Sequence, residues 1–281
     1  MSHYITIDEA RELKKHYENF PVATLLFPKK IRSAATVLYQ FARQCDDIAD
    51  EGEKTKKTRH KLLKKYSDEI INLQDKFIRR SPLFEDIKKV VDEYDLNVNL
   101  LERFMQAFKQ DVNKVRYQNI HELNDYCQKA ANPAGEMILT LFGANNNTNI
   151  YYSNSLCTAL AMIGMAQDIV EDYAKGRVYL PQDEIKEFRL KMNDIQHKNF
   201  NAYWISYKYF WVARIERLLN DGRQLEFELH GRIRLQIRVL IKAIELLIKR
   251  INAKNCNLFI APPKLSKLDW VYLSIKSLLP L

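Results

Sequence analysis

Apolar residues recur with helical spacing along almost the whole chain, and the recurrence stops only where proline, glycine or asparagine residues gather. The pattern predicts helices over residues 7–18, 30–51, 55–77, 83–94, 97–113, 120–142, 150–174, 197–221, 224–252 and 265–279. The connections are short, and neither a shift in composition nor a strict repeat divides the chain. We therefore expect residues 1–281 to form one all-α domain.

Three of the predicted helices have unusually little polar surface. Residues 33–50, 130–142 and 155–172 are apolar on nearly every side, which is typical of helices at the centre of a bundle. Two of these segments nevertheless end in clustered aspartates, and aspartate is seldom buried without a partner. This conflict between burial and charge indicates a functional site.

Aspartates four residues apart close these two segments, Asp46 and Asp50 in the first and Asp168 and Asp172 in the second. Side chains at that spacing share a helix face with Cβ atoms about 5–6 Å apart, so each pair forms a two-carboxylate claw. The charges within a claw repel each other, and a hard cation such as Mg²⁺ relieves that repulsion while it also accepts phosphate oxygens. Two claws on different helices therefore predict a site for magnesium and diphosphate. The competing interpretation is an ordinary solvated helix face.

Arginines and small apolar residues extend the pattern around the claws. Arg43 lies one turn before Asp46 and Arg177 follows the second claw, and a guanidinium binds phosphate through a planar fork of donors. Tyr39 continues the face of the first claw inward, and Ala161, Gly164 and Met165 continue the face of the second. Ala134 and Met137 lie on a comparable stripe of the third apolar helix, and most of these side chains are small or apolar. Acids above such side chains predict a central apolar cavity beneath the diphosphate site. Close packing between helices explains the small residues at least as well.

Composition supports the helical prediction. The 281 residues include 7 glycines, 8 prolines and 47% hydrophobic residues, which excludes collagen-like and disordered proteins and argues against turn-rich β sandwiches. The four cysteines occur singly, without the paired spacing of a zinc site. No stretch resembles a signal peptide or a membrane span, so we expect a cytoplasmic protein.

The 44 basic and 35 acidic residues give a net charge of +9, which suits an anionic partner. Basic runs at residues 54–65 and 230–238 match no recognised nucleic-acid module, and we expect no nucleic-acid partner. Peripheral contact with the inner face of the cytoplasmic membrane, through the apolar side of residues 270–281, is a second interpretation of this charge. It competes with an ordinary solvated surface and a C-terminal helix packed on the bundle.

The segments around both claws resemble a known family. Residues 39–50 (YQFARQCDDIAD) and 167–181 (QDIVEDYAKGRVYLP) resemble the two aspartate-rich motifs of the squalene/phytoene synthases, which are class I isoprenoid synthases with a helical bundle around a central apolar cavity. Residues 16–32, 126–143 and 176–184 resemble, more narrowly, the bacterial hydroxysqualene synthase branch. The likeness covers nearly the whole chain.

The resemblance implies roles for the candidate residues. The two claws would hold Mg²⁺ around the diphosphate of an isoprenoid substrate, which Arg43 and Arg177 would bind directly. The reacting centre would be lined by Tyr39, Tyr126 and Tyr179. A flap over its mouth would include Phe20 and Pro21. In the hydroxysqualene branch, presqualene diphosphate ionises, and water captures the rearranged cation without any reductant.

Two positions depart from the family pattern. Ala161 and Gly164 stand where the family usually has glutamine and asparagine, on the helix that leads to the second claw. This departure affects the expected reaction more than the expected fold. Its consequence could be a third metal held mainly by water, a changed product, or weak activity. One alternative is therefore head-to-head condensation of farnesyl or geranylgeranyl diphosphate to presqualene diphosphate, dehydrosqualene or phytoene. The other is a non-catalytic scaffold, although a scaffold has no reason to keep four costly inward carboxylates.

Overall fold

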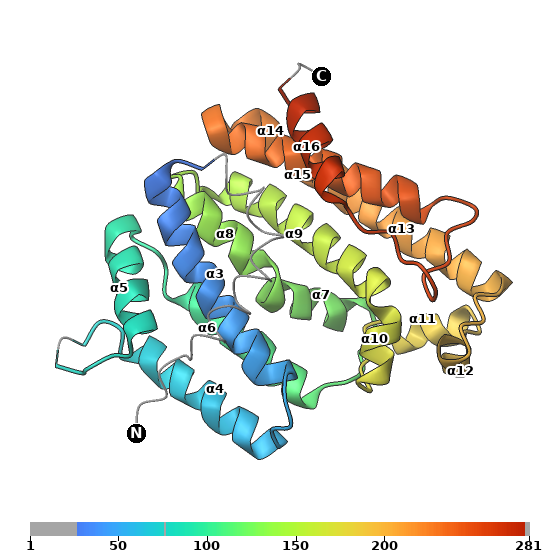
Figure 1. The fold of residues 1–281 in the computed structure, drawn as a ribbon, viewed down its shortest axis with the longest axis horizontal. Helices are drawn as coiled ribbons and strands as arrows, with labels where there is room; N and C mark the ends of the chain where they lie inside the picture. The colour runs from blue at the N-terminus through green and yellow to red at the C-terminus, as the bar shows by residue number, and fades with distance from the viewer. Residues whose placement is uncertain (1–26, 76, 279–281) are drawn as a thin grey trace.

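The computed structural model describes residues 27–75 and 77–278, where every extended regular element is a helix (Figure 1). A single β-bridge joins Tyr117 and Pro181 in this part of the chain. The all-α prediction is therefore confirmed. The predicted helix at residues 7–18 and the flap residues Phe20 and Pro21 lie outside the described residues.

The helices follow the predicted order along the chain. They are α3 (Lys29–Asp50), α4 (Lys56–Ile71), α5 (Pro82–Tyr94), α6 (Asn99–Asn113), α7 (Ile120–Ala130), α8 (Asn132–Leu141), α9 (Asn147–Gln167), α10 (Ile169–Ala174), α11 (Gln182–Glu187), α12 (Met192–Gln196), α13 (Ala202–Gly222), α14 (Leu225–Glu228), α15 (Gly231–Ile251) and α16 (Lys267–Lys276). The short α11 and α12 were not predicted, because five or six residues are too few to show a helical period.

Three predicted helices are each divided in two. The break between α7 and α8 falls next to Pro133, which lacks a backbone N–H for a continuous helix. The break before α15 falls at Gly231, whose φ of 64° lies in the left-handed region. The break between α9 and α10 falls at Asp168 itself, yet its N–H donates to Gly164 (2.9 Å) and its carbonyl accepts from Asp172 N–H (2.8 Å). The second claw therefore keeps its four-residue helical spacing.

Two apolar cores meet along the middle of the molecule. One core is built by α3, α4, α5 and α6, and the other by α9, α13 and α15, which lie on the opposite side in Figure 1. Helix α8 joins them, because Met137 and Leu141 pack into the first core and Leu139 packs into the second. Across residues 27–75 and 77–278, no helix combines the length and apolar character that a membrane crossing requires.

Candidate active site

The first claw belongs to a single face of α3 that also carries Tyr39 and Arg43. Arg43 binds acids of its own helix, since its Nη1 lies 3.0 Å from Asp46 Oδ2 and its Nη2 lies 2.7 Å from Asp47 Oδ1. Burial, together with the charges of Asp50 and Asp47, raises the pKa of Asp46 even though Arg43 opposes that shift. The pKa of Asp46 therefore stays raised although Arg43 contacts it.

Arg177 connects the two halves of the site. Its guanidinium makes a two-pronged ion pair with Asp50, with Nη2 2.5 Å from Oδ1 and Nη1 3.1 Å from Oδ2, and both side chains are largely buried. Burial alone would raise the pKa of Asp50, but the hydrogen bonds and charge of Arg177 lower it overall. These residues are 127 positions apart, so the fold brings the first claw against the segment that follows the second.

A chain of hydroxyl groups continues from Arg177 into the interior. Arg177 Nη1 donates to Tyr179 Oη (3.1 Å), which lies 3.4 Å from Tyr126 Oη. Tyr126 Oη in turn donates to Asp111 Oδ2 (3.0 Å), and the rings of Tyr117, Tyr126 and Tyr179 form a cluster with centroids 5.5–5.7 Å apart. The tyrosines therefore surround the acids with an aromatic wall.

The second claw lies near enough to the first for their charges to interact. Burial and the charges of Asp168 and Asp50 raise the pKa of Asp172 to about 6, against the opposing charges of Arg177 and Lys175. Burial and the neighbouring Glu171 raise the pKa of Asp168 as well. Because Asp50 acts on Asp172, carboxylates from both claws lie within electrostatic reach of each other.

The donor set suits a hard cation. The pKa values of Asp46, Asp168 and Asp172 are raised because these carboxylates are buried without enough neighbouring positive charge. Mg²⁺ prefers carboxylate oxygens as ligands and would supply that charge. Within the described ranges, however, no three acidic, histidine or cysteine side chains converge tightly enough to hold one ion by themselves. Each claw therefore offers one or two ligands, as expected where substrate phosphate and water complete the coordination.

Two adjacent hollows lie beside the second claw. The outer one, of 520 Å³, is open to solvent and is lined by Tyr126, Tyr179, Ala161, Gly164, Met165, Asp168 and Asp172, among others. The inner one, of 260 Å³, is lined by Tyr39, Ala42, Met137 and side chains of α15. Ala134 and Cys157 line both hollows, so the apolar cavity lies directly beside the acidic mouth.

The structure leaves open space at one of the two unusual positions. A Cβ atom added to Gly164 would meet no other atom within 4 Å, so a side chain can begin there without displacing a neighbour. Packing therefore does not require glycine at residue 164. With Ala161 also on this wall, the mouth lacks both amide groups on the α9 side.

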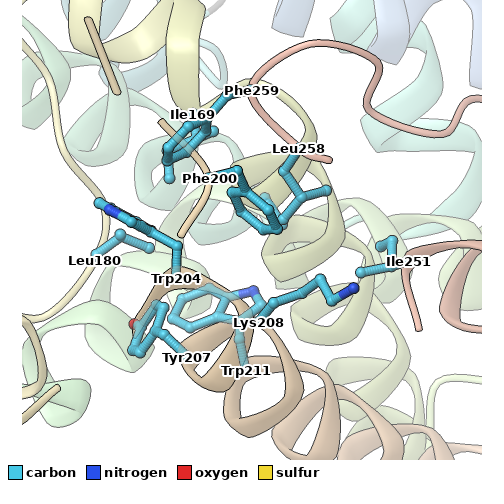
Figure 2. A pocket seen from close by; sticks show the side chains of 11 residues that line it. Ile169, Leu180, Phe200, Trp204, Tyr207, Lys208, Trp211, Ile251, Leu258 and Phe259 are labelled. Carbon is cyan, nitrogen blue, oxygen red and sulfur yellow. The ribbon is translucent and has the colours of Figure 1, made fainter. Parts of the chain in front are cut away.

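A third hollow lies on the far side of α9 and is too small for a substrate. Its volume is 20 Å³, enough for about one water molecule. Figure 2 shows Lys208 lying among the aromatic side chains of α13 and the loop residues Leu258 and Phe259. Lys208 Nζ donates to the carbonyl of Ala253 (3.1 Å), so this lysine holds the loop after α15 against the bundle.

Three charged residues of the site were not predicted from the sequence. Lys175 lies 3.6 Å from Asp50 and Lys264 contributes positive charge at Asp168. Lys264 follows Pro263, whose carbonyl accepts from Gln167 Nε2 (2.5 Å), but nothing in the loop sequence indicates this placement. Asp111 did carry a signal, because it lies four residues after the buried Ala107 on the core face of α6.

Asp111 should make stability depend on pH. Burial and the nearby claw carboxylates raise its pKa to about 7, despite Arg177 and a hydrogen bond from Tyr126, and its Oδ1 has no hydrogen-bond partner in the described structure. The unfolded chain releases this proton near pH ~4, so the folded state loses relative stability as the pH rises from there through 7. Asparagine cannot ionise, so Asp111→Asn avoids this loss of stability. The difference in unfolding free energy between Asp111→Asn and wild type should therefore be about 2–3 kcal/mol larger, in favour of the variant, at pH 8 than at pH 5.

Thermal unfolding of wild type and Asp111→Asn at both pH values measures this difference. The gap between their midpoints should widen by about 5 °C at pH 8. A gap that is equal at both pH values would show that Asp111 does not change its protonation state on folding.

Comparison with known proteins identifies the family. The sequence model described as squalene/phytoene synthase matches residues 13–269. A hydroxysqualene synthase of Rhodopseudomonas palustris is 27% identical over 250 residues, which are 88% of this chain and 84% of that protein. The squalene synthase HpnC of Alicyclobacillus acidocaldarius superposes with a TM-score of 0.79 at 28% identity, covering 86% of this chain and 90% of that one.

The fold alone is shared more widely. A dehydrosqualene synthase solved with a bound ligand superposes with a TM-score of 0.83 at 17% identity, over 95% of this chain and 93% of that one. The helical fold is therefore that of the isoprenoid synthases. Together with the match over residues 13–269, this shows that the chain belongs to the squalene/phytoene synthase family.

Proposed function

We propose that this protein is a magnesium-dependent hydroxysqualene synthase that acts on presqualene diphosphate. The observation that carries the proposal is the ion pair of Arg177 with Asp50 of the first claw, within electrostatic reach of the second claw, whose Asp168 and Asp172 line the mouth beside an apolar cavity. The mouth suits a diphosphate and the cavity suits hydrocarbon chains. The likeness to hydroxysqualene synthases supports this reaction within the family.

The residues have distinct roles in the proposed reaction. Asp46, Asp50, Asp168 and Asp172 would hold Mg²⁺, which supplies positive charge to the leaving diphosphate when bound. Arg43 and Arg177 would bind the diphosphate oxygens through their guanidinium groups. Both arginines pair with claw acids in this structure, so each would exchange a carboxylate for phosphate as the substrate binds.

The bond changes balance without a reductant. The carbon–oxygen bond to the diphosphate breaks and its electron pair leaves with the diphosphate, which generates a carbocation that rearranges in the cavity. A water oxygen then forms the new carbon–oxygen bond, and the proton that it loses passes to the departing diphosphate. The faces of Tyr39, Tyr126 and Tyr179 would stabilise the cation, and the apolar wall would exclude other water.

Product analysis tests the proposal directly. Purified protein with Mg²⁺ and presqualene diphosphate should yield hydroxysqualene, and farnesyl diphosphate alone should yield no product. Products from farnesyl or geranylgeranyl diphosphate alone would favour head-to-head condensation instead. If the protein neither binds magnesium and diphosphate nor turns over any of these substrates, the scaffold alternative holds.

Presqualene diphosphate carries long apolar chains that partition into lipid. We infer that the protein works in the cytoplasm at the inner face of the cytoplasmic membrane, where such a substrate would be found. The net charge of +9 fits an anionic membrane surface.

A further inference from the structure

Helix α16 displays a row of apolar side chains on its outward face. Leu268, Val271, Tyr272 and Ile275 are each between 54% and 80% exposed in the described structure, and we call them the α16 stripe. Their spacing of three, four and seven residues puts them on one face of the helix. Soluble proteins seldom expose a continuous apolar surface of this kind without a function.

The opposite face of α16 is firmly attached to the bundle. Leu273 is buried against Val239 and Ala243 of α15. Arg250 of α15 makes a two-pronged ion pair with Asp269, at 2.5 Å and 2.9 Å, and Ser266 completes a capping box with the same aspartate. The stripe is therefore held in a fixed orientation on the outside of α15, as Figure 1 shows for the two helices.

Positive charge borders the stripe on both sides. On a helix with 3.6 residues per turn, Lys267 and Lys276 lie about 90° to either side of the stripe. Lys276 Nζ lies 5.7 Å from the ring centroid of Tyr272, which places one ammonium group beside the stripe. The acid in α16, Asp269, is paired with Arg250, so the surroundings of the stripe are basic.

We propose that the α16 stripe docks this protein on an anionic lipid bilayer. A helix with an apolar face between rows of lysine lies in the plane of a bilayer, with the apolar side chains among the acyl chains and the ammonium groups near the phosphates. A second copy of the chain fits this surface less well. Pairing two stripes would bring their flanking lysines together in two molecules that each carry a charge of +9.

The placement of the stripe also suits the proposed function, on which this step rests. Ile233, Ile237 and Leu240 of α15 line the inner cavity, while Val239 and Ala243 of the same helix hold α16. One helix therefore separates the cavity wall from the docking surface. A bilayer at the stripe would lie close to the part of the protein that holds hydrocarbon chains.

Vesicle flotation of the full chain tests the docking surface without substrate. The vesicles are phosphatidylcholine alone or with roughly 30% phosphatidylglycerol, at about 50 mM and about 500 mM salt. Wild type should float with the anionic vesicles at low salt and much less at high salt. The double variant Val271→Ser/Ile275→Ser should bind about tenfold less. Ile71→Ser is the matched control, because Ile71 at the end of α4 is equally exposed, at 68%, and should bind like wild type.

Three outcomes would overturn the proposal. They are no flotation of wild type at low salt, equal flotation of wild type and the double variant, and a lipid-free dimer in ultracentrifugation that the double variant abolishes. The last outcome would assign the stripe to a second copy. Because flotation requires no turnover, and product analysis in detergent requires no bilayer, failure of one does not imply failure of the other.

Discussion

Asp168→Asn should lower kcat/KM by at least about a thousandfold while the protein stays as stable as wild type or becomes slightly more stable. The loss of activity follows from the proposed role of Asp168 in holding positive charge at the leaving diphosphate. The gain in stability follows from its surroundings, since burial and Glu171 already raise the pKa of this carboxyl and no ion pair of it is seen in the described residues. Steady-state kinetics and thermal unfolding at pH 8 measure both effects.

Asp50→Asn is the matched control within the first claw. It should lose activity to a similar degree but should also lower the thermal midpoint, because Asp50 forms the buried ion pair with Arg177. If Asp168→Asn unfolds as readily as Asp50→Asn, Asp168 has a structural role that the described contacts do not show. If Asp168→Asn remains fully active, the second claw does not bind the substrate complex.

The claws could be predicted because their signal is local. Two carboxylates at helical spacing conflict with the apolar segments around them, and this conflict is visible within a single stretch of 18 residues. The fold class followed from the same helical period and from the scarcity of glycine and proline. Most helix positions were correct, and the breaks at Pro133, Asp168 and Gly231 were missed because the apolar period continues across them.

The connections across the site could not be predicted from local pattern. Asp50 and Arg177 are far apart in sequence, and only the tertiary fold brings them together. Asp111 lies on the core face of α6, but a single aspartate among lysines and glutamines looks like surface. Its importance depends on Tyr126, which reaches it from another helix.

The arrangement of charges explains how the site persists without substrate. Arg43 and Arg177 bind acids of the first claw, which offsets part of the repulsion that buried carboxylates would otherwise suffer. The second claw has no comparable arginine partner among the described residues, and the pKa of Asp172 is raised to about 6. We therefore expect the second claw to gain the most when magnesium and diphosphate bind.

Arg177→Gln should both destabilise the protein and reduce turnover. Removing the guanidinium leaves Asp50 buried without its partner, which costs about 3 kcal/mol of unfolding free energy. It would also remove the proposed direct contact to the diphosphate, so kcat/KM should fall by about a hundredfold or more. Urea unfolding and product formation, measured on the same preparation, give the two quantities.

The double variant Asp50→Asn/Arg177→Gln separates these two effects. Two neutral amides can hydrogen-bond to each other without a buried charge, so most of the lost stability should return. Activity should not return, because the double variant lacks both the first-claw carboxylate and the guanidinium. A double variant that recovers stability and turnover together would show that neither charge is needed for catalysis and that the ion pair has only a structural role. Recovery of stability alone shows that the lost stability came from the unpaired Asp50 carboxylate, and that turnover needs the charged groups at residues 50 and 177 for more than folding.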